Sequence, residues 1–455
     1  MHLSREQLLS LLPRLRKVHF IGITSPFCSF SARFLQQKEI TVTASEANQE
    51  SDAAKRWIAE KVLYVGGHSA EYITDDIDLV IFPNGIIPGN PEVQETENKK
   101  RPYVLVQELL GAISTQFKTI AIAGTHGKTT TTSLITWLLH KIIGTPNFIV
   151  GDAKDTIAEI NTNWEIHPES PYLVLEACEY KKQFLSRAPE PFISVITHID
   201  LDHTDYYPTQ ESYNAAFTEF LHPTQSHVII DAQRKNESAA LQKYKGKATI
   251  LDIASLRQTV GKIESPLLFG HHNQENLLRA YAVGTVLGLT DADIRNALAT
   301  FPGVSARFEY KGITKKGTLV YKDFAHNPQK VEACLQGAKE AFPEKKLVVI
   351  YQPHNYERTA TFKDALVESL KLADVIIFPN IYSVRESDAD KQLISNQEFA
   401  DAIQKRFPKK TFFSTNDTPP YEKTRELAMK QSDDQTLLLL VSAGDIDKII
   451  PELLT

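Results

Sequence analysis

The chain has 455 residues, of which 42% are hydrophobic and 23% charged, and this composition is typical of a globular protein with a large core and about three domains. Its 50 basic and 56 acidic side chains leave a small negative charge, which argues against non-specific binding of nucleic acid. The three cysteines, Cys28, Cys178 and Cys334, argue by their number and spacing against a disulfide framework and a zinc site. No apolar run reaches the length of a membrane span or of a signal peptide. We therefore expect a cytoplasmic protein.

The first part of the chain alternates strands and helices, which is typical of a doubly wound α/β unit. The predicted strands lie at residues 17–23, 40–44 and 78–82, with a helix from about residue 29. The turn after the first strand, Gly22-Ile-Thr-Ser-Pro26, lacks the glycines of a nucleotide-binding turn, and Pro26 has no N–H to donate. Two interpretations stay open, an α/β unit that binds phosphate at this turn and one that does not.

The middle of the chain contains the pattern around which the function is organised. Residues 119–133 read Thr-Ile-Ala-Ile-Ala-Gly-Thr-His-Gly-Lys-Thr-Thr-Thr-Thr-Ser, and they predict a buried strand, a glycine turn and then an amphipathic helix over residues 133–142. Such a turn presents backbone N–H groups at a helix N-terminus, where the dipole favours anions. Lys128 adds a positive charge for the outer phosphates, and the Thr129 hydroxyl can bind magnesium. Because only two residues separate the glycines, we interpret this turn as a shortened P-loop that binds ATP.

Acidic residues and a histidine follow two further predicted strands. Glu176 lies at the end of the strand predicted at 172–177, the edge at which parallel sheets bind ligands, and it can hold a magnesium ion that bridges phosphates. The segment Asp200-Leu-Asp-His-Thr-Asp205 follows the strand predicted at 192–196. In this segment His203 can coordinate a second cation or orient a phosphate, and a solvated loop is the alternative.

The chain then continues toward a domain boundary. We predict a strand at residues 227–231, a surface segment at 233–247 and an amphipathic helix at 276–288. Asn276 ends the segment Gly270-His-His-Asn-Gln-Glu-Asn276, and its amide can read an adenine edge or cap a helix. Phe301-Pro-Gly-Val304 is typical of a turn and marks a boundary.

The last third alternates strands and helices again, which predicts a third doubly wound unit. Its predicted elements lie at residues 319–324, 329–341, 346–351, 362–372, 374–378, 399–407, 425–430 and 436–441. Asp323-Phe-Ala-His-Asn-Pro328 and Gln352-Pro-His-Asn-Tyr-Glu-Arg358 each place a histidine after a strand. Arg358 can bind a carboxylate through two hydrogen bonds, with a core or surface role as the alternative.

Taken together, these motifs resemble those of the Mur ligase family, ATP-dependent enzymes that join an amino acid to the growing cell-wall precursor. The resemblance covers nearly the whole chain, and its motifs lie at residues 123–131, 176–179, 202–205, 270–276, 306–309, 323–328, 352–354 and 443–445. It implies three doubly wound α/β domains. These are a Rossmann-like N-terminal domain at 1–113, a central P-loop ATPase-like domain at 114–305 and a Rossmann-like C-terminal domain at 306–455.

The resemblance also implies a reaction, in which a substrate carboxylate attacks the γ-phosphate of ATP and an amine then displaces phosphate from the acyl phosphate. ATP would contact Gly124, Thr125, His126, Gly127, Lys128, Thr129, Thr130, Asn276, Arg307 and Asp323. Catalysis would depend on Lys128, Glu176 and His203, and Mg²⁺ would be held by Thr129, Glu176 and His203. The substrates, UDP-N-acetylmuramate and an amino acid, would face Gly22, His326, His354 and Arg358.

Within the family the chain resembles the alanine-adding branch. Phe217 stands where several sister ligases carry a lysine that is modified to a carbamate, and the segments 352–354 and 382–386 favour the same branch. The related ligase that recycles a wall tripeptide also lacks that lysine, and Ile87-Pro-Gly-Asn-Pro-Glu92 is similar to it. A recycling ligase, or a divergent Mur ligase with another acceptor, is therefore the alternative.

Three departures from the family pattern concern the substrates. The first turn, residues 22–27, lacks the family's glycines, Asn327 follows His326 where a second histidine is expected, and Asn355 replaces an arginine. Two alternatives belong to other classes, a P-loop protein that hydrolyses ATP to drive a partner and a non-catalytic binding module. We expect a monomer or a homodimer.

Overall fold

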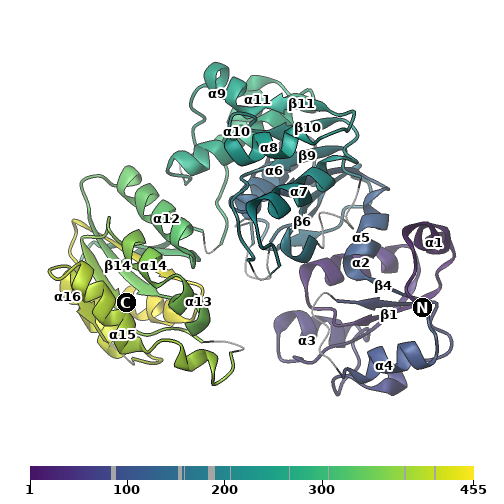
Figure 1. The fold of residues 1–455 in the computed structure, drawn as a ribbon, viewed down its shortest axis with the longest axis horizontal. Helices are drawn as coiled ribbons and strands as arrows, with labels where there is room; N and C mark the ends of the chain where they lie inside the picture. Colours follow the sequence, from purple (N-terminus) through teal and green to yellow (C-terminus); the bar gives the residue numbers. More distant parts are fainter. Residues whose placement is uncertain are drawn as a thin grey trace. The chain divides into compact units, whose positions relative to one another are not determined.

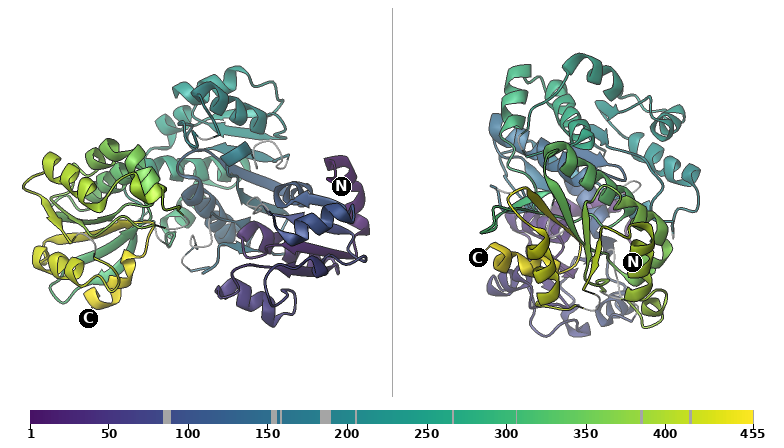
Figure 2. Two further views of the ribbon diagram at one scale, coloured as in Figure 1. Left: turned by 60° about the horizontal axis from the view of Figure 1, so that its bottom comes forward. Right: turned by 90° about the vertical axis from the view of Figure 1, so that its left-hand side faces the viewer.

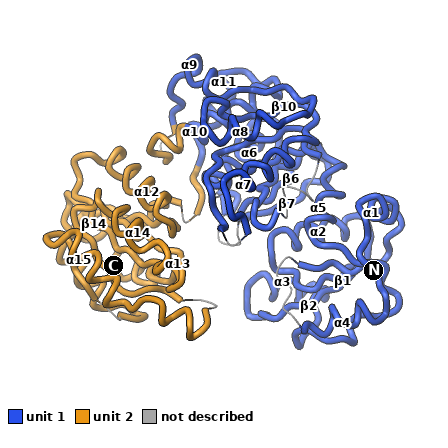
Figure 3. The backbone as a smooth tube through the Cα atoms, viewed as in Figure 1, with its two compact units in different colours: residues 1–264, 275–301 blue, residues 265–274, 302–455 orange. Residues whose placement is uncertain are grey.

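A computed structural model describes residues 1–83, 89–151, 156–157, 159–182, 190–204, 206–265, 267–305, 307–383, 386–414 and 417–454. Its strands form three sheets of four, seven and six strands (Figure 1), so the predicted α/β fold with three units is confirmed. The chain divides into two compact units, residues 1–264 with 275–301 and residues 265–274 with 302–455 (Figure 3). The domain boundaries after residues 113 and 305 fall between the sheets and stay a prediction.

The first sheet is parallel throughout and has the order β2-β1-β3-β4. Its strands are β1 (Lys17–Ile21), β2 (Thr41–Ser45), β3 (Leu79–Phe82) and β4 (Tyr103–Leu105). Its helices are α1 (Arg5–Leu11), α2 (Pro26–Gln37), α3 (Asp52–Ala59), α4 (Pro91–Asn98) and α5 (Val106–Ser114). Alternate strand residues point to opposite faces, so Val18 and Phe20 join the core with α2 and α5, while Ile21 packs on the face that α4 covers. The unit is therefore doubly wound.

The seven-stranded sheet has the order β11-β10-β9-β5-β8-β6-β7, and only β7 is antiparallel to its neighbour. Its strands are β5 (Lys118–Ala123), β6 (Asn147–Ile149), β7 (Trp164–Glu165), β8 (Tyr172–Glu176), β9 (Ile193–Ile196), β10 (His227–Ile230) and β11 (Thr249–Asp252). Its helices are α6 (Lys128–Ile142), α7 (Gln210–Leu221), α8 (Lys235–Gln242), α9 (Ile253–Val260), α10 (His271–Val286) and α11 (Asp291–Ala299). Because β5 lies at the centre, the turn after it opens at the middle of the carboxyl edge, where such sheets bind ligands.

The six-stranded sheet has the order β12-β13-β17-β14-β15-β16, and β12 is antiparallel at one edge. Its strands are β12 (Glu309–Ile313), β13 (Leu319–Asp323), β14 (Lys346–Gln352), β15 (Val375–Phe378), β16 (Thr411–Phe413) and β17 (Thr436–Ser442). Its helices are α12 (Pro328–Ala341), α13 (Tyr356–Thr361), α14 (Lys363–Ser369), α15 (Asn396–Arg406), α16 (Glu422–Gln431) and α17 (Ile450–Leu454). Separate apolar clusters line the two faces, one with α12, α14 and α15 and the other with α16 and α17, and Figure 2 shows helices on both sides of this sheet.

Two elements of the central sheet differ from the sequence prediction. The helix after the glycine turn begins at Lys128 rather than at residue 133, and all residues from Thr131 to Leu139 are buried. The helix packs on α11, where Trp137 Nε1 donates to the Ala297 carbonyl at 3.1 Å. It is therefore a mostly buried helix and not the amphipathic one that the sequence predicted. The predicted surface segment 233–247 contains α8, whose Glu237 and Ala240 are buried.

No helix in the described part of the chain is long and apolar enough to span a membrane.

Candidate active site

The turn between β5 and α6 needs both of its glycines. Gly124 has φ +140, and a Cβ there would lie 2.1 Å from Thr197 Oγ1. Gly127, the residue that precedes α6, has φ +81, and a Cβ there would lie 2.5 Å from Asn276 Oδ1. A side chain at either position would clash with neighbouring protein atoms, so this turn requires glycine at both places. The turn leads into the N-terminus of α6, where backbone N–H groups can bind an anion.

Thr125 anchors the turn to the end of β9. Its N–H donates to the His198 carbonyl at 2.7 Å, and its hydroxyl donates to the Asp200 carbonyl at 2.7 Å. The same hydroxyl accepts from the Asp200 N–H at 2.9 Å and lies 3.0 Å from the Tyr213 hydroxyl. Both the N–H and the hydroxyl of Thr125 thus shape the loop, and its contact with ATP stays a prediction.

Lys128 reaches back over the turn. Its ammonium donates to the Gly124 carbonyl and lies 2.9 Å from the carboxylate of Glu179, which is only 2% exposed. Burial by itself would lower the pKa of Lys128, but the charges of Glu179 and Glu176 and the hydrogen bond to Glu179 together raise it. Burial likewise would raise the pKa of Glu179, but Lys128 and a hydrogen bond from His203 together lower it to about 2. Both side chains are therefore charged at neutral pH.

Glu176, at the carboxyl end of β8, faces the first turn of α6. The Thr129 hydroxyl donates to Glu176 Oε1 at 3.3 Å, and the Gly151 N–H donates to Oε2 at 2.8 Å. A carboxylate and a hydroxyl at a phosphate-binding turn are the oxygen ligands that Mg²⁺ takes, together with phosphate oxygens and water. The pair Thr129 and Glu176 therefore fits a cation that is shared with bound phosphates.

His203 lies on the other side of Glu179. Its Nε2 is 3.7 Å from Glu179 Oε1, and the ring of Tyr180 lies against it at 4.6 Å between centroids. The residue adopts φ +53, and its N–H donates to Asp202 Oδ1 at 2.8 Å. Thus Lys128, Glu179 and His203 form a chain of contacts from the P-loop to the segment after β9. Asp205, in the same motif, lies outside the described residues.

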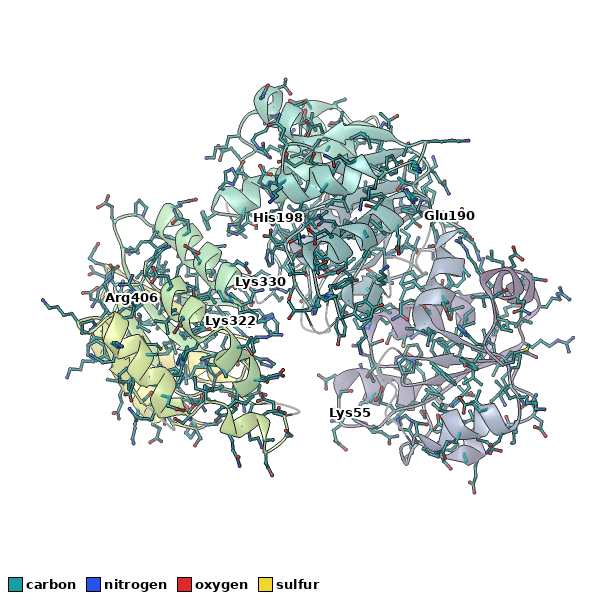
Figure 4. The ribbon with its side chains drawn as sticks, in the orientation of Figure 1. Lys55, Glu190, His198, Lys322, Lys330 and Arg406 are labelled. Carbon is teal, nitrogen blue, oxygen red and sulfur yellow. The ribbon has the colours of Figure 1, made fainter. Side chains whose placement is uncertain are left out.

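Asn276 in α10 contacts the P-loop helix, because its Oδ1 accepts from the Thr131 hydroxyl at 3.2 Å. His126 lies within the loop, with its ring 6.3 Å from that of His198, which Figure 4 labels. Thr130 occupies the first turn of α6. The central sheet thus gathers the predicted phosphate, metal and adenine residues of this unit at one edge, although their contacts with ATP stay predictions.

In the other unit, Arg307 and Asp323 lie at the carboxyl end of β13. Asp323 accepts from the Phe308 N–H at 2.8 Å and the Ala325 N–H at 2.7 Å, and burial raises its pKa. The guanidinium of Arg307 lies 5.4 Å from the centroid of the Phe324 ring. The Asp323 carboxylate therefore holds the backbone at Phe308 and Ala325 in place. Its contact with the ribose stays a prediction. Ala306, before Arg307, lies outside the described residues.

His326, His354 and Arg358 are brought together in the same unit. The rings of His326 and His354 are 6.4 Å apart, and the ring of His354 is 5.8 Å from that of Tyr382. Burial, together with the charges of Lys330 (labelled in Figure 4) and Arg358, holds the pKa of His326 well below its usual value. At neutral pH this cluster therefore presents a neutral imidazole near a cationic guanidinium, which suits an amine and a carboxylate of one small molecule.

Gln352 explains two motifs of the last third that had no assigned role. Its Oε1 accepts from the Ser442 hydroxyl at 2.8 Å and from the Ile446 N–H at 3.1 Å, and its Nε2 donates to the Tyr421 hydroxyl at 3.0 Å. A Cβ at Gly444 would lie 2.5 Å from Gln352 Oε1. The motifs 352–354 and 443–445 are thus two halves of one buried junction between β14 and β17. In the segment 382–386, residues 384 and 385 lie outside the described residues.

The turn after β1 is occupied by the protein itself. Glu46, which follows β2, accepts from the Ile23 N–H at 3.3 Å, the Thr24 N–H at 3.2 Å and the Thr24 hydroxyl at 2.7 Å through one oxygen. The N-cap Ser25 accepts from the Cys28 N–H. Gly22, predicted to face the substrate, has φ +85 and allows this turn, but a carboxylate takes the N–H groups that a phosphate would use. Of the segment 87–92, residues 87 and 88 lie outside the described residues.

Sequence reasoning missed two of these acids. Glu179 stands three residues after Glu176 and was quoted in a motif without a role, although two acids at a strand end beside a P-loop are a usable signal. Glu46 directly follows the second strand of an α/β unit, the place where an acid commonly faces the ligand turn. Their partners lie 51 residues (Lys128) and 22 residues (Thr24) away, a proximity that only the fold reveals.

A shortened P-loop that faces acidic strand ends, in the middle one of three α/β sheets, defines a class of ATP-using α/β enzymes. Three family models match the chain: the Mur ligase family, catalytic domain at residues 17–118, the Mur ligase middle domain at 122–258 and the Mur ligase, glutamate ligase domain at 306–444. A UDP-N-acetylmuramate–L-alanine ligase of Agathobacter rectalis is 31% identical over 96% of this chain and 97% of its own. The chain belongs to the Mur ligase family of ATP-dependent ligases, which act in peptidoglycan synthesis.

Further known proteins are similar to the chain. A UDP-N-acetylmuramate–L-alanine ligase of Salinibacter ruber is 33% identical over 83% of this chain and 82% of its own. The crystal structure of UDP-N-acetylmuramate–alanine ligase MurC from Thermotoga maritima has TM-score 0.71 at 24% identity, covering 96% of this chain and 98% of that one. A murein peptide ligase from Psychrobacter arcticus has TM-score 0.62 at 20% identity, covering 96% and 98%. These two structures share the fold.

Proposed function

We propose that this enzyme joins L-alanine to the carboxylate of UDP-N-acetylmuramate, with ATP converted to ADP and phosphate. The observation that carries the proposal is the cluster of Lys128, Thr129, Glu176 and His203 at the carboxyl edge of the central sheet. The choice of substrates is supported by the names of the relatives from Agathobacter rectalis and Salinibacter ruber.

In the proposed reaction the substrate carboxylate attacks the γ-phosphate of ATP, and ADP leaves. The amine of the amino acid then attacks the acyl carbon, and phosphate leaves with the oxygen that had come from the carboxylate. Such a phosphoryl transfer needs positioning and charge neutralisation more than covalent help from the protein. Lys128 and the N–H groups at the start of α6 supply positive charge where the phosphates would lie.

We propose that Mg²⁺ is held by Thr129, Glu176 and His203 together with the phosphates. When bound, the ion would neutralise phosphate charge and align the reacting oxygens. The chain's own part is to keep Glu176 aimed at Thr129 by the hydrogen bond from Gly151. We also propose that Asn276, Arg307 and Asp323 contact ATP.

For the amino acid we propose the pocket of His326, His354 and Arg358. Arg358 would bind the amino acid's carboxylate, and the neutral imidazole of His326 would accept a hydrogen bond from its amine. We further propose a cytoplasmic enzyme, because ATP is available there, and a monomer or homodimer, which light scattering distinguishes.

The test is ADP release measured over a grid of acceptors and amino acids. UDP-N-acetylmuramate, N-acetylmuramate and free muropeptides form one axis, and alanine, glycine, serine and glutamate form the other. The proposal predicts the highest kcat/KM with UDP-N-acetylmuramate and L-alanine. ADP release that needs no acceptor would instead support a P-loop ATPase, and no release at all would support a non-catalytic binding module.

One observation favours a second candidate, a Mur ligase with another acceptor or one that recycles a wall peptide. The carboxylate of Glu46 fills the turn at Ile23 and Thr24, where the family's glycines would hold the UDP diphosphate. The same grid distinguishes the candidates. Equal or higher kcat/KM with an acceptor that lacks the diphosphate, or with a tripeptide in place of alanine, would support the second.

A further inference from the structure

One buried carboxylate contacts both the P-loop lysine and the histidine proposed to bind metal. Glu179 Oε2 lies 2.9 Å from Lys128 Nζ, and Glu179 Oε1 lies 3.2 Å from the same nitrogen and 3.7 Å from His203 Nε2. The side chain is 2% exposed, against 14% for Lys128 and 32% for His203. Glu179 thus lies between the other two side chains and is the most deeply buried of the three.

The position of Glu179 is fixed by the surrounding core. Its carbonyl accepts from the Tyr207 hydroxyl and from the Lys182 N–H at 3.0 Å. Tyr207 is 1% exposed and packs edge-on against the ring of Tyr213 at 4.8 Å. The backbone of Glu179 is therefore held in place, with Lys128 at the start of α6 and His203 in the segment after β9 both in reach of its carboxylate.

Bound nucleotide would change the pairing between Lys128 and Glu179. Without nucleotide, Lys128 neutralises Glu179 and bonds to the Gly124 carbonyl. Phosphates at the start of α6 compete for Lys128, and an ionised carboxylate left alone in a buried site is unfavourable. A cation beside His203 would neutralise Glu179 as soon as Lys128 turns to the phosphates.

We propose that Glu179 is the positioning residue through which nucleotide affinity is coupled to magnesium: it holds Lys128 when the site is empty and faces the cation when Lys128 binds phosphate. The inference rests on the proposed roles of ATP and Mg²⁺. Coupling of this kind is reciprocal, so each ligand strengthens the binding of the other by the same factor. Removing the charge of Glu179 should weaken that coupling from both sides.

The substitution Glu179→Gln keeps the size of the side chain and removes its charge. Lys128 is then free to bind phosphate, and repulsion between the carboxylate and ATP disappears, so ATP binds about tenfold more tightly without metal. The gain in ATP affinity on adding Mg²⁺ falls by about tenfold, because the cation loses a neighbouring charge. A merely structural role for Glu179 would weaken ATP binding in both conditions.

The experiment is titration calorimetry of the full-length protein with ATP, once in EDTA and once in excess Mg²⁺. The control is Glu219→Gln, which removes the charge of a carboxylate that is 47% exposed and lies 2.9 Å from Lys182. The ATP affinities of this control in EDTA and in Mg²⁺ should both match the wild type. Glu179→Gln with wild-type affinity in EDTA, or with weaker affinity in both buffers, overturns the inference. A wild-type protein that binds no ATP in either buffer instead contradicts the proposed ATP site.

Should Glu179→Gln fail to fold, Glu179→Asp tests the same claim. The shorter side chain moves the charge away from Lys128 and His203, so ATP affinity in EDTA rises by a smaller factor, about threefold. Unchanged or weaker affinity of Glu179→Asp in EDTA overturns the inference.

Discussion

At the scale of single residues, Gly127 shows how closely the P-loop is packed. Its φ of +81 is unfavourable for any other residue, and the amide of Asn276 lies where its Cβ would be. The loop therefore has its shape because a backbone, and not a side chain, approaches α10. The glycine spacing in the sequence was enough to predict the turn, but the neighbouring Asn276 is 149 residues away and its contact could not be predicted.

We expect Gly127→Ala to lower the affinity for ADP at least about tenfold, because the added methyl group shifts the loop or Asn276 by more than a hydrogen-bonded site tolerates. The measurement is titration calorimetry with ADP. The matched control is Gly144→Ala, since Gly144 has φ +100 and nothing within 4 Å of its Cβ position. It should lose a similar amount of stability and keep its affinity; equal affinities in both variants would contradict the packing account.

We expect Lys128→Ala to abolish ADP release while the protein stays folded, since the substitution removes the ammonium beside the phosphate site and leaves the core intact. Circular dichroism checks the fold and a coupled assay checks the rate. Lys141→Ala, in the same helix but 38% exposed and stacked on Trp137, should retain its rate. An unchanged rate in Lys128→Ala would remove Lys128 from the mechanism.

At the scale of elements, ion pairs tie the start of α10 to α9 and to the next turn of α10 itself. Glu275 accepts two hydrogen bonds from Arg257 at 2.7 and 2.9 Å and one from Arg279 at 3.2 Å. Arg279 is 1% exposed, so its charge depends on Glu275. Burial would raise the pKa of Glu275, but the hydrogen bond from Arg257 and the neighbouring cations lower it to about 2.

We expect Glu275→Gln to lower the free energy of unfolding by about 3 kcal/mol at pH 7, because it leaves Arg279 buried without a counter-charge. The folded-state pKa of Glu275 is lower than the unfolded one, so its contribution is complete above about pH 4.5 and is lost as the pH falls toward 2. Urea unfolding at pH 7 and pH 3 measures this, with the exposed Glu264→Gln as control. A difference from wild type that stays constant between the two pH values would contradict the pairing.

Elements with strong local signals were predicted from sequence and weak ones were not. β5, β8, β13 and β17 carry long apolar runs and were predicted within one or two residues, as was α12. The short strands β6, β7 and β16 were missed, because two or three residues carry too little pattern. Most of the Glu275 network was equally out of reach: Arg279 lies four residues further along the same helix, but Arg234 and Arg257 come from other parts of the chain.

At the scale of the whole molecule, three α/β sheets follow from the alternation of strands and helices along the chain. The grouping of residues 265–274 with the C-terminal unit does not follow from that alternation. It arises because Phe269 packs on Phe308 and Phe342, at 5.9 and 5.8 Å between ring centroids. Likewise, the sequence shows that the first turn lacks the family's glycines. Only the fold shows that Glu46 accepts hydrogen bonds from the N–H groups of that turn.

The central claim, an amide-forming ligase that activates a carboxylate with ATP, is tested most directly by isotope transfer. The acceptor carboxylate is labelled with oxygen-18, and the phosphate released during turnover with ATP and L-alanine is analysed by mass spectrometry. The account predicts one labelled oxygen in each phosphate, because the carboxylate oxygen stays on phosphorus when the amine displaces it. Phosphate that carries oxygen only from ATP and water would contradict the account.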